Sequence, residues 1–348
     1  MLTTGLSFIF VLGLLIFVHE LGHFLTAKLV GIRVERFSLG FPPRMVGKKI
    51  GETDYCISWL PLGGYVKMAG MVDESLDAEI TGEPWEYQSK PVWQRIIVIS
   101  AGSIMNILTA IFIYSMIFYH SGMDVPLGTT EVGELMPDKP AQTIGLLPGD
   151  IITAVDGQPV STWSELTQII HNKPEVEVEI EWLRDDQKYV SKVTPERQPN
   201  SHIGLIGIAP RFEHQELGMV AAFKYGLSRS YTLVKLVAYS LKMIVVGKES
   251  LKDAIGGPII IAKMAGETAK MGMQALLAFT AFISLNLGMF NMLPFPVLDG
   301  GHLVFLLIEG IRRKPLSIKT KVTVQKIGMA FLLALMVFVI FNDLRRIL

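Results

Sequence analysis

Four long runs of apolar residues limit what this chain can fold into more than any other feature. A helix that crosses a bilayer needs about 20 predominantly apolar residues, and each run is long enough. Hydrophobic residues make up 50% of the 348-residue chain, which is too much for an average soluble domain and too little for membrane helices alone. We therefore expect an α-helical polytopic membrane protein with about four transmembrane helices and an inserted soluble domain. The runs cover residues 5–27, 96–119, 271–308 and 322–341.

Charge and cysteine content exclude several classes of protein. The 32 basic and 32 acidic residues give a net charge of zero, so we expect no nucleic-acid partner. The single cysteine, Cys56, permits neither a disulfide framework nor a cysteine-rich metal site. The first run lacks the basic start and the A-x-A cleavage site of a signal peptide, so we interpret it as a membrane helix.

Basic residues gather in two of the loops between the apolar runs. Lysine and arginine crowd the loop over residues 28–95 and the loop over residues 309–321. The positive-inside rule places both loops in the cytoplasm. Both termini and the region between the second and third runs are then extracytoplasmic, although Arg345 and Arg346 oppose this weakly.

Composition divides the chain into a membrane core in two parts, a soluble α+β domain and a stretch of amphipathic helices. In that stretch, apolar residues recur at helical spacing among lysines and arginines, which favours helices lying on the outer membrane face over a fifth span. Prolines break the third span, over residues 271–311, into a helix, an interruption and more helix. The parts are residues 1–120 and 271–348 (membrane core), 121–212 (soluble, extracytoplasmic) and 213–270 (amphipathic).

Turn and cap signals predict the secondary structure of the soluble domain. Asp156-Gly157 predicts a turn between strands, and Ser161 or Thr162 can cap a helix. The alternating stretch VEVEIEW, residues 176–182, predicts a half-buried strand that turns at RDDQK into another.

The first cytoplasmic loop contains β-forming residues beside the membrane. Strand signals at Tyr55–Trp59 and Tyr65–Met68, joined by LPLGG, predict a hairpin over residues 55–70. Its apolar character predicts that it dips into the membrane, where its backbone must be buried against protein or line a wet cavity.

The first apolar run ends in HELGH, which places three polar side chains where a membrane helix is expected. On a helix, His19 and His23 share a face one turn apart, so their imidazoles can hold a zinc ion. Glu20 lies beside them, placed to take a proton from the water that such a metal activates. Ionisable residues in membrane spans are rare and usually functional, which favours this interpretation over a chance match.

A catalytic zinc site needs a third protein ligand and an open position. Asp299 is the candidate, because a carboxylate inside a membrane is costly unless it is paired or metal-bound. His302 competes with it, but we expect His302 to mark the interface or to bond a ligand. Asn291 can donate hydrogen bonds to a substrate carbonyl or to the oxyanion formed on attack. The remaining histidines fall in or beside the soluble domain.

A metal at this depth brings water chemistry to a substrate inside the membrane, and a membrane-spanning peptide is the expected substrate. A helix hides its carbonyls in its own hydrogen bonds, so such a substrate must first be unwound. An edge strand of the predicted hairpin can hold it extended by strand addition.

The motifs HELGH, GLLPGDIITAVDGQPV and NMLPFPVLDGGH, in this order, resemble those of the site-2 protease family, specifically the bacterial RseP-type intramembrane zinc metalloproteases. The resemblance extends over essentially the whole chain. It implies four spans, an extracytoplasmic PDZ domain and a place in the bacterial cytoplasmic membrane. It also implies regulated intramembrane proteolysis of anti-sigma factors or remnant signal peptides. Its motifs imply Zn2+ as the cofactor, His19, His23 and Asp299 as ligands and Glu20 as the base.

The resemblance also implies which residues contact the substrate. Asn291 and Pro294 belong to the family's NxxPxPxLDGG stretch, and LGGYVKMAG resembles a β element next to the active site. In the second span Gly102 and Asn106 match the family, but the proline that often follows the glycine is missing. The β element implies substrate contacts for Gly64, Tyr65, Val66 and Lys67.

Some alternatives stay open at this point. The single PDZ domain either binds an extended peptide or only excludes substrates with bulky ectodomains, and the sequence does not distinguish these two roles. A non-catalytic membrane PDZ scaffold would need neither Glu20 nor Asp299. A metal transporter would need polar residues at more than one level of the bundle, and the second span offers only Ser, Thr and Asn. We therefore expect a zinc endopeptidase whose partners are the lipid bilayer and single-span proteins or signal peptides.

Overall fold

The computed structural model describes residues 2–71, 80–198, 202–248 and 256–347. The chain divides into two compact units, which are residues 1–119 with 218–348, and residues 120–217. We name them the membrane unit and the inserted domain.

Four described helices of the membrane unit are long and apolar enough to cross a membrane, which confirms the predicted number of spans. The third predicted span is interrupted as expected, because residues 292–298 between two helices are not helical. Pro294 and Pro296 lie in this break, where the missing amide N–H of proline prevents the helix from continuing. The four helices are α1 (Leu2–Leu29), α2 (Val92–Ser121), α8 (Met273–Asn291) and α10 (Ile318–Ile347), and α9 (Asp299–Arg312) follows the break.

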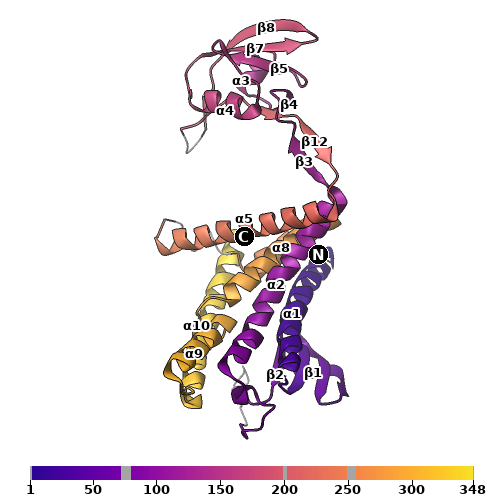
Figure 1. The fold of residues 1–348 in the computed structure, drawn as a ribbon, viewed down its shortest axis with the longest axis vertical. Helices are drawn as coiled ribbons and strands as arrows, with labels where there is room; N and C mark the ends of the chain where they lie inside the picture. The colour runs from indigo at the N-terminus through magenta and orange to yellow at the C-terminus, as the bar shows by residue number, and fades with distance from the viewer. Residues whose placement is uncertain (1, 72–79, 199–201, 249–255, 348) are drawn as a thin grey trace. The chain divides into compact units, whose positions relative to one another are not determined.

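Two more helices of this unit, α5 (Met219–Val245) and α7 (Pro258–Lys270), come before α8 in the chain. Helix α5 buries Leu233 against a cluster from α2 and α8 and exposes other apolar side chains beside its lysines. This mixed surface is that of an amphipathic helix. Figure 1 shows α5 crossing the end of the bundle at which both chain termini lie.

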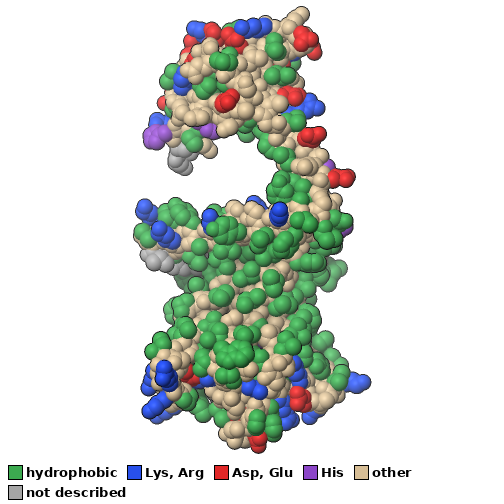
Figure 2. Space-filling model, viewed as in Figure 1, with side chains coloured by type: hydrophobic (Ala, Val, Ile, Leu, Met, Phe, Trp, Pro, Cys, Tyr) green, Lys and Arg blue, Asp and Glu red, His purple; other side chains and the backbone are tan. Residues whose placement is uncertain are grey.

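Apolar side chains cover the visible outer face of the helix bundle, and lysines and arginines gather at its two ends (Figure 2). Proteins in water rarely expose contiguous apolar surface of this extent, so the bundle is suited to lipid. Exposed apolar side chains on α1, α2 and α10 include Phe10, Ile104, Leu108, Phe112, Val337 and Phe338.

The hairpin predicted over residues 55–70 is wrong in its pairing. Strands form at both predicted places, but both belong to one long strand, β2 (Thr53–Met68), and they do not pair with each other. Residues 34–39 of β1 (Val34–Ile50) lie between them and pair with residues 54–57 on one side and with residues 64–68 on the other. The local pattern could not reveal this, because the partner comes from a stretch whose charges and prolines conceal its strand character.

The inserted domain is built on an antiparallel sheet with strand order β6-β5-β7-β8 and a core that includes Leu166, Ile180 and Trp182. The predicted turn is confirmed, with positive φ at Asp156 and Gly157. Further strand pairs are β3 with β12, β4 with β11, and β9 with β10. The bounds are β3 Met123–Pro126, β4 Val132–Leu135, α3 Pro140–Thr143, β5 Ile151–Val155, β6 Gln158–Pro159, α4 Trp163–His171, β7 Val178–Arg184, β8 Gln187–Val193, β9 Glu196–Arg197, β10 Gly204–Leu205, β11 Ile208–Pro210 and β12 Phe212–Gln215.

The predicted helix cap and the alternating strand are also confirmed. The Thr162 hydroxyl accepts a hydrogen bond from the Glu165 amide, and the Glu165 carboxylate accepts one from the Thr162 amide, which makes a capping box at the start of α4. Backbone N–H groups of Ser161 and Thr162 at this carboxylate lower the pKa of Glu165. Strand β7 carries the predicted alternation, with Val178, Ile180 and Trp182 buried.

A buried group of charges joins α2, α9 and α10. The carboxylate of Glu309 accepts hydrogen bonds from Arg95 Nη1 at 2.9 Å, from Lys321 Nζ at 2.7 Å and from the Leu316 amide at 3.0 Å. The three charged side chains are only 2–10% exposed. Arg95 and Lys321 belong to the two stretches predicted as basic loops, whereas the structure buries them between helices.

Candidate metal centre and active site

One face of α1 carries two imidazoles side by side. His19 and His23 lie one turn apart in an uninterrupted helix, and their Nε2 atoms are 3.2 Å apart. A rise of 1.5 Å per residue places His19 about 15 Å from the Leu29 end of α1. Both imidazoles belong to a helix that is long and apolar enough to cross a hydrocarbon layer about 30 Å thick.

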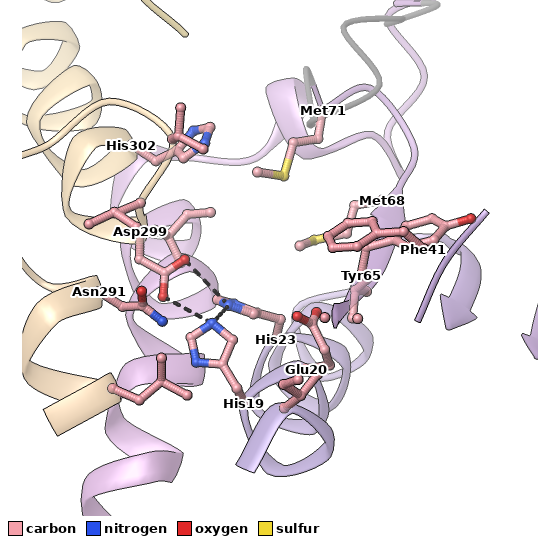
Figure 3. Close-up of a pocket in the computed structure, with 18 of the residues that line it drawn as sticks. His19, Glu20, His23, Phe41, Tyr65, Met68, Met71, Asn291, Asp299 and His302 are labelled. Carbon is pink, nitrogen blue, oxygen red and sulfur yellow. Dashed lines mark hydrogen bonds and ion pairs between the residues drawn. The ribbon is translucent and has the colours of Figure 1, made fainter. Parts of the chain in front are cut away.

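Asp299 reaches the same point from the start of α9. Its Oδ2 lies 3.5 Å from Nε2 of His19, and its Oδ1 lies 3.5 Å from Nε2 of His23 (Figure 3). The turn that aims the carboxylate needs glycine behind it, because a Cβ at Gly300 would lie 2.1 Å from the carbonyl oxygen of Leu293.

The three donor groups fit a tetrahedral zinc ion. Zinc–ligand distances of about 2.0–2.1 Å in a tetrahedron separate neighbouring ligand atoms by about 3.3 Å. The two imidazole nitrogens are 3.2 Å apart, and each lies 3.5 Å from a different oxygen of the carboxylate, which is close to this separation. One ligand atom from each residue gives a set whose members all lie within 4.8 Å of one another. Two imidazoles and one carboxylate leave a fourth position open, as in catalytic zinc sites. His19, His23 and Asp299 form the group of described residues that could hold a metal ion.

Helix α2 supports all three of these side chains, and this support was not predicted from the sequence. An apolar helix sequence does not reveal which of its faces meets α1, so the only signal lay in the few small polar residues of the span. The contacts are a hydrogen bond from His23 Nδ1 to the Val98 carbonyl (2.8 Å), one from the Ser103 hydroxyl to Asp299 (3.0 Å), and the Asn106 amide 3.3 Å from His19 Nδ1.

Replacing Gly102 with alanine is expected to weaken zinc binding by about 10- to 100-fold, the range seen when the surroundings of metal ligands are altered. The glycine lets α2 lie directly against the imidazoles, and a Cβ there would be 2.3 Å from Nε2 of His23 and 2.7 Å from Cε1 of His19. Zinc affinity measured by competition with a chelator checks this. The control is Gly13→Ala in α1, where a Cβ would meet nothing within 4 Å, so affinity should stay unchanged. Equal affinities in the two variants would contradict the prediction.

The ligand atoms line a pocket of about 290 Å³ whose walls come from α1, β1, β2, α2, α8, α9 and α10. Glu20 and Asn291 line the same pocket. Figure 3 shows the Glu20 carboxylate between the histidines and Tyr65 of β2. The structure therefore brings together the residues that the sequence picked out for the metal, the base and the oxyanion, although they come from helices far apart in the chain.

The predicted substrate contacts meet the pocket only in part. Gly64, Tyr65 and Val66 line it, whereas Lys67 and Pro294 do not. The ammonium of Lys67 pairs with Glu35 at 3.4 Å, and Pro294 is exposed. Both residues lie outside the pocket lining, because a motif match does not say which way each side chain points, and their contacts with substrate stay predictions.

His302 also lines the pocket, but it is not one of the three grouped ligands. Its Nε2 lies 3.2 Å from Nε2 of Gln325 in α10. Phe41, Met68 and Met71 complete the wall facing the metal centre, and sequence reasoning did not single them out.

The chain matches the family described as Peptidase family M50 over residues 7–335. This chain belongs to Peptidase family M50. It is 32% identical to the regulator of sigma-W protease RasP of Bacillus subtilis (strain 168), with 99% of each chain covered. It is 31% identical to the zinc metalloprotease RasP of Bacillus licheniformis, with 99% of this chain and 100% of that one covered.

As an M50 peptidase with relatives of this kind, the protein is a zinc metalloprotease with membrane helices, and its cofactor is zinc. Among solved structures, the PDZ domain of an SdrC-like protein from Listeria monocytogenes matches 25% of this chain over 93% of its own length, at 26% identity and a TM-score of 0.22.

Proposed function

We propose that this M50 peptidase cleaves membrane-spanning segments of single-span proteins within the bilayer. The proposal is carried by three ligand side chains whose ligand atoms all lie within 4.8 Å of one another, held by apolar helices in a pocket beside a β-strand. His19, His23 and Asp299 hold the zinc, and Glu20 moves the proton. Such a site is reached by a substrate that is itself in the membrane.

The catalytic roles follow from the placement of the side chains. Bound zinc supplies Lewis acidity, which lowers the pKa of water to near 7 and polarises a peptide carbonyl. Glu20 takes a proton from the attacking water and passes it to the amine that leaves when the peptide bond breaks. The Asn291 amide donates a hydrogen bond to the carbonyl oxygen as negative charge develops on it.

The segment of β2 over residues 63–66 holds the substrate in an extended form. It pairs with Phe37–Leu39 of β1 on one side, and its residues line the pocket. Strand addition to it would expose the carbonyls that a helical substrate hides and would supply backbone hydrogen bonds. Gly64 lets this strand approach α1, because a Cβ there would lie 3.0 Å from Cγ of Glu20.

The protein lies in the bacterial cytoplasmic membrane with β1, β2 and the connection between α9 and α10 on its cytoplasmic side. The positive-inside rule supports this orientation, since lysines and arginines gather in these two loops. The termini and the inserted domain are then extracytoplasmic, and the two termini lie at the same end of the bundle (Figure 1).

The biological substrates are anti-sigma factors or remnant signal peptides, cut after another protease has removed the ectodomain. The name of the Bacillus subtilis relative, regulator of sigma-W protease, supports the first of these.

The inserted domain acts as a PDZ domain that binds an extended peptide. A cavity of about 70 Å³ beside α4 supports this, because it has an apolar lining next to strand residues that a peptide could join. Its lining residues include Ile170 and His171 of α4 and Leu205, Gly207 and Ile208.

Removal of zinc tests the proposed function. The purified enzyme is reconstituted in liposomes with a single-span substrate that lacks its ectodomain, and the fragments are identified by mass spectrometry. We expect a cut inside the apolar segment, its loss with a zinc chelator and its return on adding zinc. Cleavage that resists the chelator, or a cut outside the apolar segment, would contradict the proposal.

A further inference from the structure

The side-chain amide of Asn106 in α2 is buried. Its nitrogen lies against the proposed zinc ligand His19, and its oxygen has no hydrogen-bond partner among the described residues. The side chain is fully buried, and Nδ2 lies 3.3 Å from Nδ1 of His19. Oδ1 has no hydrogen-bond partner among the described residues. A buried amide oxygen without a partner destabilises the folded protein, so this arrangement calls for a reason.

The hydrogen positions on the two imidazoles follow from their neighbours. Nδ1 of His23 lies 2.8 Å from the Val98 carbonyl, which can only accept, so this nitrogen carries the hydrogen and Nε2 keeps its lone pair for a metal. His19 likewise presents Nε2 to the centre, 3.5 Å from Asp299. Zinc bound through Nε2 therefore requires the hydrogen of a neutral His19 to be on Nδ1, where it needs an acceptor.

The NH2 end of the Asn106 amide cannot accept a hydrogen bond, but its oxygen can. We propose that Asn106 is the positioning residue for His19: when zinc is held, Oδ1 of its amide faces His19 and accepts the hydrogen of Nδ1. One half-turn of the amide then gives His19 a side-chain acceptor, in addition to the Gly102 backbone that already interacts with it, and gives Oδ1 the partner that it lacks among the described residues. The inference rests on the proposed function, since it takes His19 to be a zinc ligand.

The surroundings hold Asn106 in place for this role. The hydroxyl of Ser284 in α8 donates to the backbone carbonyl of Asn106 at 2.7 Å, and Gly288, one turn further along α8, lets the two helices approach closely. Together with Val98 for His23 and Ser103 for Asp299, Asn106 completes a set in which α2 provides one partner for each ligand. Such partners fix the tautomer and direction of a ligand and raise its basicity.

Two substitutions at the same position test the inference through zinc affinity in detergent, measured by competition with a chelator. Asn106→Leu keeps the approximate size but removes the acceptor, so affinity should fall by about 10- to 100-fold. Asn106→Asp keeps an acceptor, so affinity should stay near that of the wild type. The matched control is Asn286→Leu in α8, since Asn286 donates to the Phe282 carbonyl of its own helix at 2.8 Å and should not affect zinc.

Equal loss in the Leu and Asp variants, or loss in neither, would overturn the inference, and so would equal loss in the control. A measurement on the unmutated protein does not depend on whether the variants fold. The nitrogen NMR spectrum of the zinc-loaded protein should show a protonated Nδ1 on His19, and a bare Nδ1 there would also overturn it. If the unmutated protein binds no zinc, the proposed function fails, whereas normal zinc binding with an insensitive Asn106 refutes this inference alone.

Discussion

Glu20→Gln is expected to lower the rate of peptide cleavage by about 10²- to 10⁴-fold while zinc stays bound, because this range is typical of a lost general acid–base group. Glutamine has nearly the same size and cannot take a proton from water. The three proposed zinc ligands, His19, His23 and Asp299, are untouched by the substitution. Cleavage of a reconstituted single-span substrate and the zinc content of the same samples measure the two effects separately.

Two further variants make this result specific. Glu267→Gln changes a glutamate on the exposed face of α7, 59% accessible, and should cleave like the unmutated enzyme. Asp299→Asn removes the charged ligand, so it should lose zinc together with cleavage. Near-normal cleavage by Glu20→Gln with zinc bound would reject Glu20 as the proton carrier. Loss of zinc from this variant would instead place Glu20 among the groups that hold the metal.

The parts of the site that could be predicted from the sequence are those encoded by local patterns. Helical spacing alone places His19 and His23 on one face, and the two prolines before Asp299 predict an interruption of the helix. The energetic cost of polar groups in a membrane then made a shared ion the simplest explanation for these residues. The structure brings their side chains together at distances that fit zinc.

The parts that could not be predicted depend on contacts between distant segments. No local sequence pattern shows that residues 34–39 insert between two segments of β2. The role of Asn106 depends on which face of α2 meets α1, and the apolar residues around it do not encode that face. Arg95 and Glu309 lie 214 residues apart, so their pairing was equally hidden. In a membrane protein, the faces of a helix that contact lipid and the faces that contact other helices are both apolar. Hydrophobic periodicity therefore says little about which helices meet.

Glu309→Ala is expected to lower the free energy of unfolding by about 3–5 kcal/mol, the usual cost of removing one partner from a buried ion pair. Arg95 and Lys321 are only 8% and 10% exposed, so both cations would stay buried without their carboxylate. The Leu316 amide would also lose its acceptor. Thermal or denaturant unfolding in detergent checks this. The control, Glu267→Ala, breaks an exposed pair with Lys263 and should cost less than about 1 kcal/mol.

A triple variant separates two causes of the lost stability, which are buried charges without a partner and lost packing. Replacing Arg95, Glu309 and Lys321 together by methionine removes every charge of the group, and buried ion groups replaced in this way often keep or regain stability. We therefore expect the triple variant to be more stable than Glu309→Ala. If it is equally unstable, packing rather than charge explains the loss. Because Glu309 is in the helix that begins at Asp299, Glu309→Ala should also loosen zinc, and the triple variant should restore part of that affinity.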